Sequence, residues 1–156
     1  MRKAAWAPLM FLSGCMLPPL LLAGDSGARA HLIGGTVSSL PSKSEGNFNL
    51  TDGEAFLFRS KGVTLRIPYN KINVLEYGQR VDRRYLEAIV ISPFLLLSKK
   101  RKHYLTVGYT DESGRQQALV FQVDKSGIRS VLAGLEAKSG RKVEFQDEQA
   151  RKAGKG

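Results

Sequence analysis

Residues 105–140 read LTVGYTDESGRQQALVFQVDKSGIRSVLAGLEAKSG, and this stretch decides the fold class. Its first part alternates apolar and polar residues with a period of two, which places Leu105 and Val107 on one face. A polar turn at 111–114 separates that run from a second alternating run at 119–123. Alternation of this kind predicts strands with one face on a core, and the short turn predicts an antiparallel hairpin.

The end of the same stretch changes its period to that of a helix. Apolar residues recur there at i, i+3, i+4 and i+7, which predicts an amphipathic helix over residues 125–139. Asp124 or Ser126 can cap its start, and Gly140 can end it. The apolar stripe consists of Ile128, Val131, Leu132 and Leu135.

Further period-two runs precede the hairpin and are separated by turns that contain Gly or Pro. They lie at residues 48–50, 55–58, 63–67 and 72–77. We therefore expect a mainly β (α+β) fold, a bent antiparallel sheet or open barrel of about six to seven strands with one C-terminal helix. The domain should span residues 31–145, followed by a disordered basic tail at 146–156 that has no apolar periodicity.

The first thirty residues have the organisation of a signal peptide. Arg2 and Lys3 precede a mostly apolar stretch at 4–24, which three prolines make unsuitable for a durable membrane-spanning helix. Ala28-Arg29-Ala30 then provides small residues at the positions that signal peptidase requires. Cleavage after Ala30 predicts an exported protein, periplasmic or secreted, that begins at His31.

A second export signal overlaps the first. The sequence LSGC at 12–15 resembles the lipobox of bacterial lipoproteins, in which Cys15 would be lipidated and become the first residue. Residues 16–22 remain apolar, whereas the linker after a lipid anchor is normally polar, so simple cleavage is the favoured interpretation. Cys15 is the single cysteine, and the domain after it therefore has no disulfide.

A strong excess of positive charge indicates anionic partners. The formal net charge is +10, and Arg2, Lys3 and Arg29 against Asp25 leave about +8 for the part after residue 30. Such a charge favours phospholipid headgroups, acidic polymers or nucleic acid. Nucleic acid is the weakest of these interpretations, because an exported protein seldom meets it.

The basic residues gather on both sides of the apolar run at 86–97, which is too short and, with Pro93, too interrupted to span a bilayer. The flanking apolar and basic residues could together contact an anionic membrane surface. The favoured alternative is that the run packs in the core and the basic residues form a solvated loop. The candidate anion or membrane patch consists of Arg80, Arg83, Arg84, Lys99, Lys100, Arg101, Lys102 and His103.

Catalytic and metal-binding signatures are missing from the sequence. The histidines are His31 and His103, far apart in the chain, and a zinc site needs three or four Cys, His or carboxylate ligands. No phosphate-binding glycine loop, dinucleotide-binding motif or nucleophile elbow is present. We therefore predict no enzymatic activity, no cofactor and no bound metal.

Short strands followed by one C-terminal amphipathic helix resemble the pleckstrin-homology (PH) superfold, including its GRAM-like and bacterial variants, over about residues 32–145. The resemblance implies a bent sheet forming an open barrel with the helix at one end. Phosphoinositide-binding members use basic residues in the first strand-to-strand loop, where this chain has Lys43 alone, so that role is not transferred. Three stretches, 75–79, 98–106 and 135–143, are also similar to a group of uncharacterised secreted bacterial proteins.

These features together predict a non-catalytic exported binding domain. Its expected partner is an anionic lipid surface or an acidic protein, reached through the basic patch. The alternative is a structural or accessory domain of the cell envelope that contacts its partner by strand pairing at a sheet edge.

Overall fold

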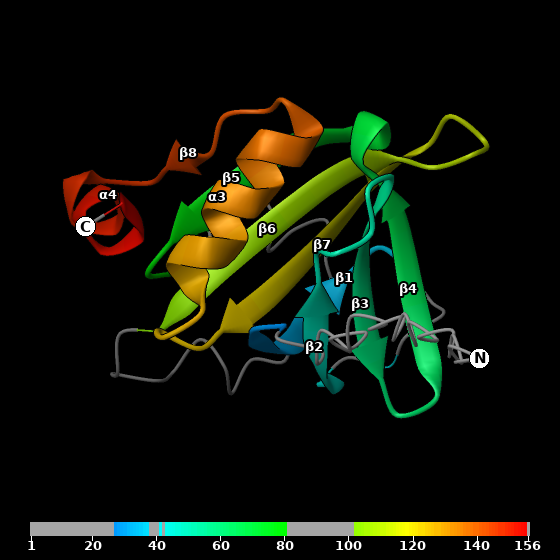
Figure 1. The fold of residues 1–156 in the computed structure, drawn as a ribbon, viewed down its shortest axis with the longest axis horizontal. Coiled ribbons are helices and arrows are strands. Elements are labelled where there is room, and N and C mark those ends of the chain that lie inside the picture. The colour runs from blue at the N-terminus through cyan, green and yellow to red at the C-terminus, as the bar shows by residue number, and fades with distance from the viewer. Residues whose placement is uncertain (1–26, 38–40, 42, 81–101, 156) are drawn as a thin grey trace, which may run out of the picture.

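The alternating runs form one curved sheet of eight strands, which two helices accompany in the described part of the chain (Figure 1). The computed structural model describes residues 27–37, 41, 43–80 and 102–155. A 3-10 turn, η1 (Tyr69–Lys71), connects the fourth and fifth strands. The strands are β1 (Arg29–Gly35), β2 (Glu45–Asn49), β3 (Ala55–Ser60), β4 (Val63–Pro68), β5 (Ile72–Gly78), β6 (His103–Thr110), β7 (Gln116–Val123) and β8 (Glu144–Phe145).

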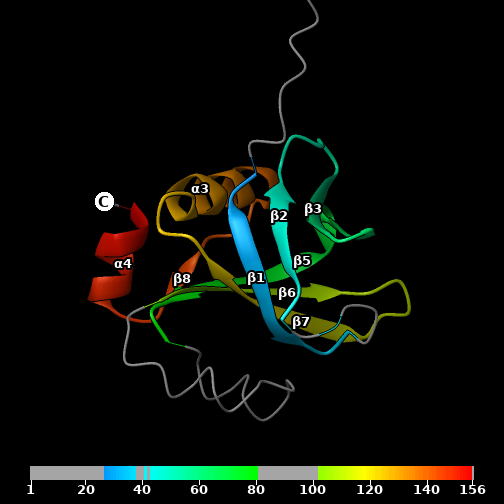
Figure 2. The same ribbon diagram turned by 90° about the horizontal axis from the view of Figure 1, so that it is seen from below.

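The strand order is β4-β3-β2-β1-β7-β6-β5-β8, and every pair is antiparallel except β5 with β8. β1 pairs with both β2 and β7, so it joins the two halves of the sheet, which run in different directions (Figure 2). This confirms the predicted mainly β architecture with an antiparallel sheet. The sheet has one strand more than expected, because the two-residue β8 adds to the edge of β5.

The predicted hairpin turn at 111–114 is confirmed. β6 and β7 pair from His103↔Val123 to Thr110↔Gln116, and Asp111 organises the turn between them. Its carboxylate accepts hydrogen bonds from the backbone N–H groups of Ser113 and Arg115, both at 2.9 Å. Hydrogen bonds from the side chains of Ser113 and Gln117 contribute most to holding the Asp111 pKa far below its usual value.

Four phenylalanine rings fill the centre of the core, between the two halves of the sheet. Phe48 from β2 lies 4.9 Å from Phe56, 5.8 Å from Phe58 and 5.0 Å from Phe121, measured between ring centroids. The tilted and edge-on contacts are the geometries that aromatic rings prefer. Apolar side chains of the C-terminal helix belong to the same cluster.

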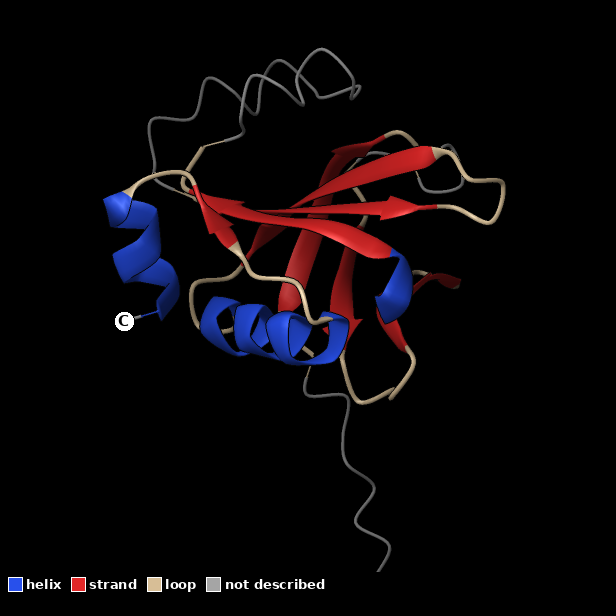
Figure 3. Ribbon diagram, turned by 90° about the horizontal axis from the view of Figure 1, so that it is seen from above, coloured by secondary structure: helices blue, strands red, loops and turns tan. Residues whose placement is uncertain are grey.

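That helix, α3 (Ile128–Ser139), covers one side of the curved sheet (Figure 3). All four residues of the predicted stripe are buried, which confirms the period. The helix begins later than the predicted residue 125, because Gly127 is its N-cap and neither Asp124 nor Ser126 provides a side-chain cap. Gly140 ends it in the left-handed conformation, as predicted, and its N–H donates to the Glu136 carbonyl at 3.0 Å.

Helix α4 (Glu148–Lys155) stands where the sequence predicts a disordered tail. The Asp147 carboxylate caps it by accepting a hydrogen bond from the Ala150 N–H at 2.6 Å. Ala150 and Gly154 are buried, and a Cβ built on Gly154 would lie 2.6 Å from the Phe145 ring. Ala150, Ala153 and Gly154 lie at i, i+3 and i+4 on one face, but residues this small are only weakly apolar, so the sequence pattern alone does not indicate the helix.

Candidate functional site

The structure describes the two ends of the connection between β5 and β6, where the predicted basic patch lies. Gly78 pairs with Tyr104, so Arg80 after β5 and Lys102 before β6 lie at the same end of the sheet. Arg80 is exposed and Lys102 is half-buried. The remaining predicted residues of the patch before His103, the apolar run at 86–97 and the predicted lipidation site Cys15 lie outside the described residues. Those patch residues are Arg83, Arg84, Lys99, Lys100 and Arg101.

The connection between β7 and α3 brings two more basic residues to this end. His103 pairs with Val123, and Lys125 follows two residues later. Burial lowers the pKa of His103, and the positive charge of Lys125 lowers it further. Burial raises the pKa of Tyr77. The positive charge of Arg129, in the first turn of α3, acts in the opposite direction, so Arg129 lies near Tyr77.

Helix α4 adds a fifth basic residue at the same end, on the left of Figure 1. The Arg129 Nε atom donates to the Ala153 carbonyl at 3.4 Å, and Lys155 Nζ lies 5.4 Å from the centre of the Phe145 ring. That ring in turn meets Tyr77 edge-on at 5.9 Å. Within the described part of the chain, the ion pairs involve none of the five residues that we call the basic end. The basic end comprises Arg80, Lys102, Lys125, Arg129 and Lys155.

Sequence analysis missed three members of the basic end, Lys125, Arg129 and Lys155. The position of Lys125 can be derived from the predicted hairpin. Antiparallel pairing across the turn at 111–114 places the residues just after the second strand beside those just before the first strand. The hairpin register therefore held the information that places Lys125 near Lys102, which the sequence analysis did not use, whereas Arg129 and Lys155 depend on how the two helices pack.

His103 and Tyr77 form a stacked pair at the base of the basic end. Their rings are 6.0 Å apart with an interplanar angle of 9°, and the Tyr77 hydroxyl is hydrogen-bonded to Nδ1 of His103. Burial raises the Tyr77 pKa, so the hydroxyl keeps its proton. Burial favours the neutral form of the imidazole, in which one ring nitrogen accepts a hydrogen bond and the other donates one.

We expect His103 to make the fold less stable in mild acid. The pKa of its imidazole is lower in the folded protein than in the unfolded chain, where it is about 6.5. As the pH falls below the pKa of the unfolded chain, the unfolded chain takes up the proton first. The free energy of unfolding therefore decreases until the pH also falls below the lower pKa of the folded protein. Urea unfolding at pH 7.5 and pH 5.5 should show a smaller loss for His103→Gln than for the parent. An equal loss in both proteins would contradict the assignment.

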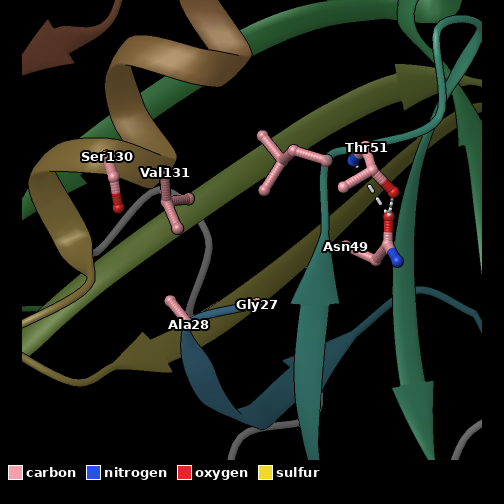
Figure 4. A pocket seen from close by; sticks show the side chains of 7 residues that line it. Gly27, Ala28, Asn49, Thr51, Ser130 and Val131 are labelled. Carbon is pink, nitrogen blue, oxygen red and sulfur yellow. Dashed lines mark hydrogen bonds between the residues drawn. The ribbon is translucent and has the colours of Figure 1, made fainter. Parts of the chain in front are cut away.

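A small pocket lies between the start of β1, the end of β2 and the start of α3 (Figure 4). Its volume is about 210 Å³. The Thr51 N–H and hydroxyl donate to the Asn49 side-chain oxygen at 3.0 and 2.7 Å, and the Ser130 hydroxyl donates to the Gly127 carbonyl at 2.9 Å. None of the described residues that line the pocket is ionisable, so these walls provide no acid or base. They are Gly27, Ala28, Asn49, Leu50, Thr51, Ser130 and Val131.

Among residues 27–37, 41, 43–80 and 102–155, no group of three or more His, Cys, Asp or Glu side chains is placed to hold a metal ion. In the same ranges, no helix combines the length and apolar character needed to cross a membrane. No protein-family model matches the chain, and no similar sequence is found among the curated proteins.

Proposed function

We propose that this protein is a non-catalytic exported binding domain that docks on an anionic surface, of lipid or of an acidic protein, through the basic end. The observation that carries the proposal is the convergence of basic residues from separate segments. Arg80 and Lys102 come from the β5–β6 connection, Lys125 from the β7–α3 connection, Arg129 from the first turn of α3, and Lys155 from α4. These segments lie at one end of the sheet (Figure 1).

We further propose that the fold belongs to the PH-like class. The long strands follow the order β4-β3-β2-β1-β7-β6-β5, so the meander bends back until β1 meets β7. Helix α3 follows β7 and adds its apolar face to the core of the bent sheet. This arrangement supports the assignment, because PH-like domains combine a bent antiparallel sheet with one helix at its end.

The magnitude of the charge effect makes docking physically reasonable. A basic residue close to an anionic membrane contributes on the order of 1 kcal/mol, which is about fivefold in affinity. The contributions of several residues on one surface add, whereas basic residues spread around the molecule cannot reach the same surface together. Docking of this kind weakens steeply as salt rises, because dissolved ions screen charges at the protein surface.

The four-residue variant Arg80→Gln, Lys102→Gln, Lys125→Gln and Arg129→Gln should bind vesicles of equal parts phosphatidylglycerol and phosphatidylcholine about tenfold or more weaker than the parent. Co-sedimentation over a salt series measures both the affinity and its salt dependence. The matched control removes the same charge elsewhere, with Gln replacing Lys43, Lys61, Lys71 and Lys142. Equal binding by both variants contradicts docking through the basic end. Vesicle binding by neither parent nor variant would leave an acidic protein as the proposed partner.

A second candidate function is strand pairing at the outer edge of β4. All six residues of β4 pair with β3, and no other described strand pairs with β4. Val63 at its start is 41% exposed, the largest exposure among the large apolar side chains of the described residues. An extended segment of a partner could add to this edge. Partner binding that persists at high salt, and that the four-residue variant retains, would favour this candidate.

A further inference from the structure

Residues 27–30, which precede the predicted first residue of the processed protein, His31, take part in the fold. The Phe48 N–H donates to the Ala28 carbonyl at 3.0 Å, and the Asp124 N–H donates to the Arg29 carbonyl at 3.2 Å. Ala30 has none of its surface exposed and belongs to the core cluster. These residues therefore connect β1 to β2 on one side and to the end of β7 on the other.

Gly27 and Ala28 also lie in close contact with their neighbours. A Cβ built on Gly27 would stand 1.4 Å from the carbonyl oxygen of Phe48, so this position accepts no side chain without a shift of the backbone. A Cβ built on Gly127 would lie 2.3 Å from the Cβ of Ala28. The segment is thus inserted between β2 and the first residues of α3, beside the pocket of Figure 4.

Cleavage after Ala30 would remove much of this arrangement. Two of the three residue pairs between β1 and β2, Arg29↔Asn47 and Ala30↔Gly46, would be lost, leaving His31↔Glu45. The Phe48 N–H and the Asp124 N–H would lose their carbonyl acceptors. Phe48 lies at the centre of the aromatic core, so the loss would reach the most buried part of the domain.

We infer that the working domain retains Gly27 to Ala30, and that any processing of the exported chain takes place upstream of Gly27. This inference rests on the export that the proposed function includes. It deepens that proposal, because Ala28 lies against Gly127, next to the segment that carries Lys125 and Arg129. The retained chain therefore joins the domain beside the basic end.

The first test is the intact mass and N-terminal sequence of the protein isolated from its native cell-envelope fraction. We expect the first residue to be Gly27 or a residue before it, which includes a chain that begins at Cys15 with the added mass of a lipid. A first residue after Gly27, His31 above all, overturns the inference. A chain that starts at His31 and still binds anionic vesicles would leave the proposed function standing, so the two failures are distinguishable.

A second test uses two glycine variants of the full chain. Gly27→Ala should lower the midpoint of thermal unfolding by about 5 °C or more, because the added Cβ meets backbone atoms. The matched control is Gly53→Ala, where a Cβ would meet nothing within 4 Å, and its midpoint should change by less than about 2 °C. Equal midpoints for the two variants would show that the segment before Ala30 contributes nothing to the fold, which overturns the inference.

Discussion

Phe48→Ala should lower the free energy of unfolding by about 3–5 kcal/mol. Phe48 is 0% exposed, and its ring contacts those of Phe56, Phe58 and Phe121. Truncation removes the burial of a large aromatic surface and leaves a cavity that three fixed rings cannot fill. The loss is a large part of the 5–15 kcal/mol typical of a whole domain, so the variant should unfold at much lower urea concentration.

Urea unfolding followed by far-UV circular dichroism measures this effect. The control is Val63→Ala, at a side chain that is 41% exposed at the start of β4, where a change within about 0.5 kcal/mol is expected. Similar losses for the two variants would contradict a core built around the Phe48 ring. The slope of the unfolding free energy against urea concentration should be the same for the variants and the parent. An unchanged slope shows that the substitution alters stability and leaves the surface exposed on unfolding unchanged.

The strands were predictable because their apolar residues alternate with polar ones. On β6, Leu105 and Val107 face the core while Thr106 faces away, as the alternation of the sequence indicates. Thr106 is nevertheless buried, and so are Ile33 and Val120, which face the same side of the sheet. A period-two pattern specifies which residues share a face and leaves open how strongly each face is covered.

The C-terminal segment was not predictable from periodicity, for a physical reason. The apolar residues Val143 and Phe145 suggest a short extended piece after α3, but its pairing as the two-residue β8 depends on α3 returning the chain to the edge of β5. Helix α4 is held by Ala150 and Gly154, whose small size allows close approach. In both cases tertiary packing, rather than local preference, determines the structure.

The candidate site was predictable in part. The sequence shows Arg80, Lys102 and His103 as members of basic clusters, and the structure places all three at one end of the sheet. Lys125 and Arg129 join them through the topology, because β7 ends beside the start of β6 and leads directly into α3. The charge of a residue can be read from the sequence, whereas its neighbours across the fold require the strand register.

Leu135→Ala should lower the free energy of unfolding by about 2–5 kcal/mol. Leu135 is 0% exposed and belongs to the stripe by which α3 packs into the core. The alanine preserves helix propensity, so the loss reports packing rather than a weaker helix. The control is Leu65→Ala, the same change at a half-buried side chain of β4, which should cost about 1–2 kcal/mol. Equal losses at the two positions would contradict the docking of α3 through this stripe.

The same variant tests whether vesicle binding depends on where the basic residues lie or only on the net charge of the chain. Leu135→Ala leaves the formal net charge at +10, but α3 carries Arg129 and begins three residues after Lys125. At a temperature where the variant is unfolded and the parent is folded, vesicle binding by the variant should fall together with its helical circular dichroism signal. Binding that persists at full strength would mean that the net positive charge alone drives association. Binding that is lost would mean that the fold, by gathering the basic residues at one end, creates the surface that docks on an anionic partner.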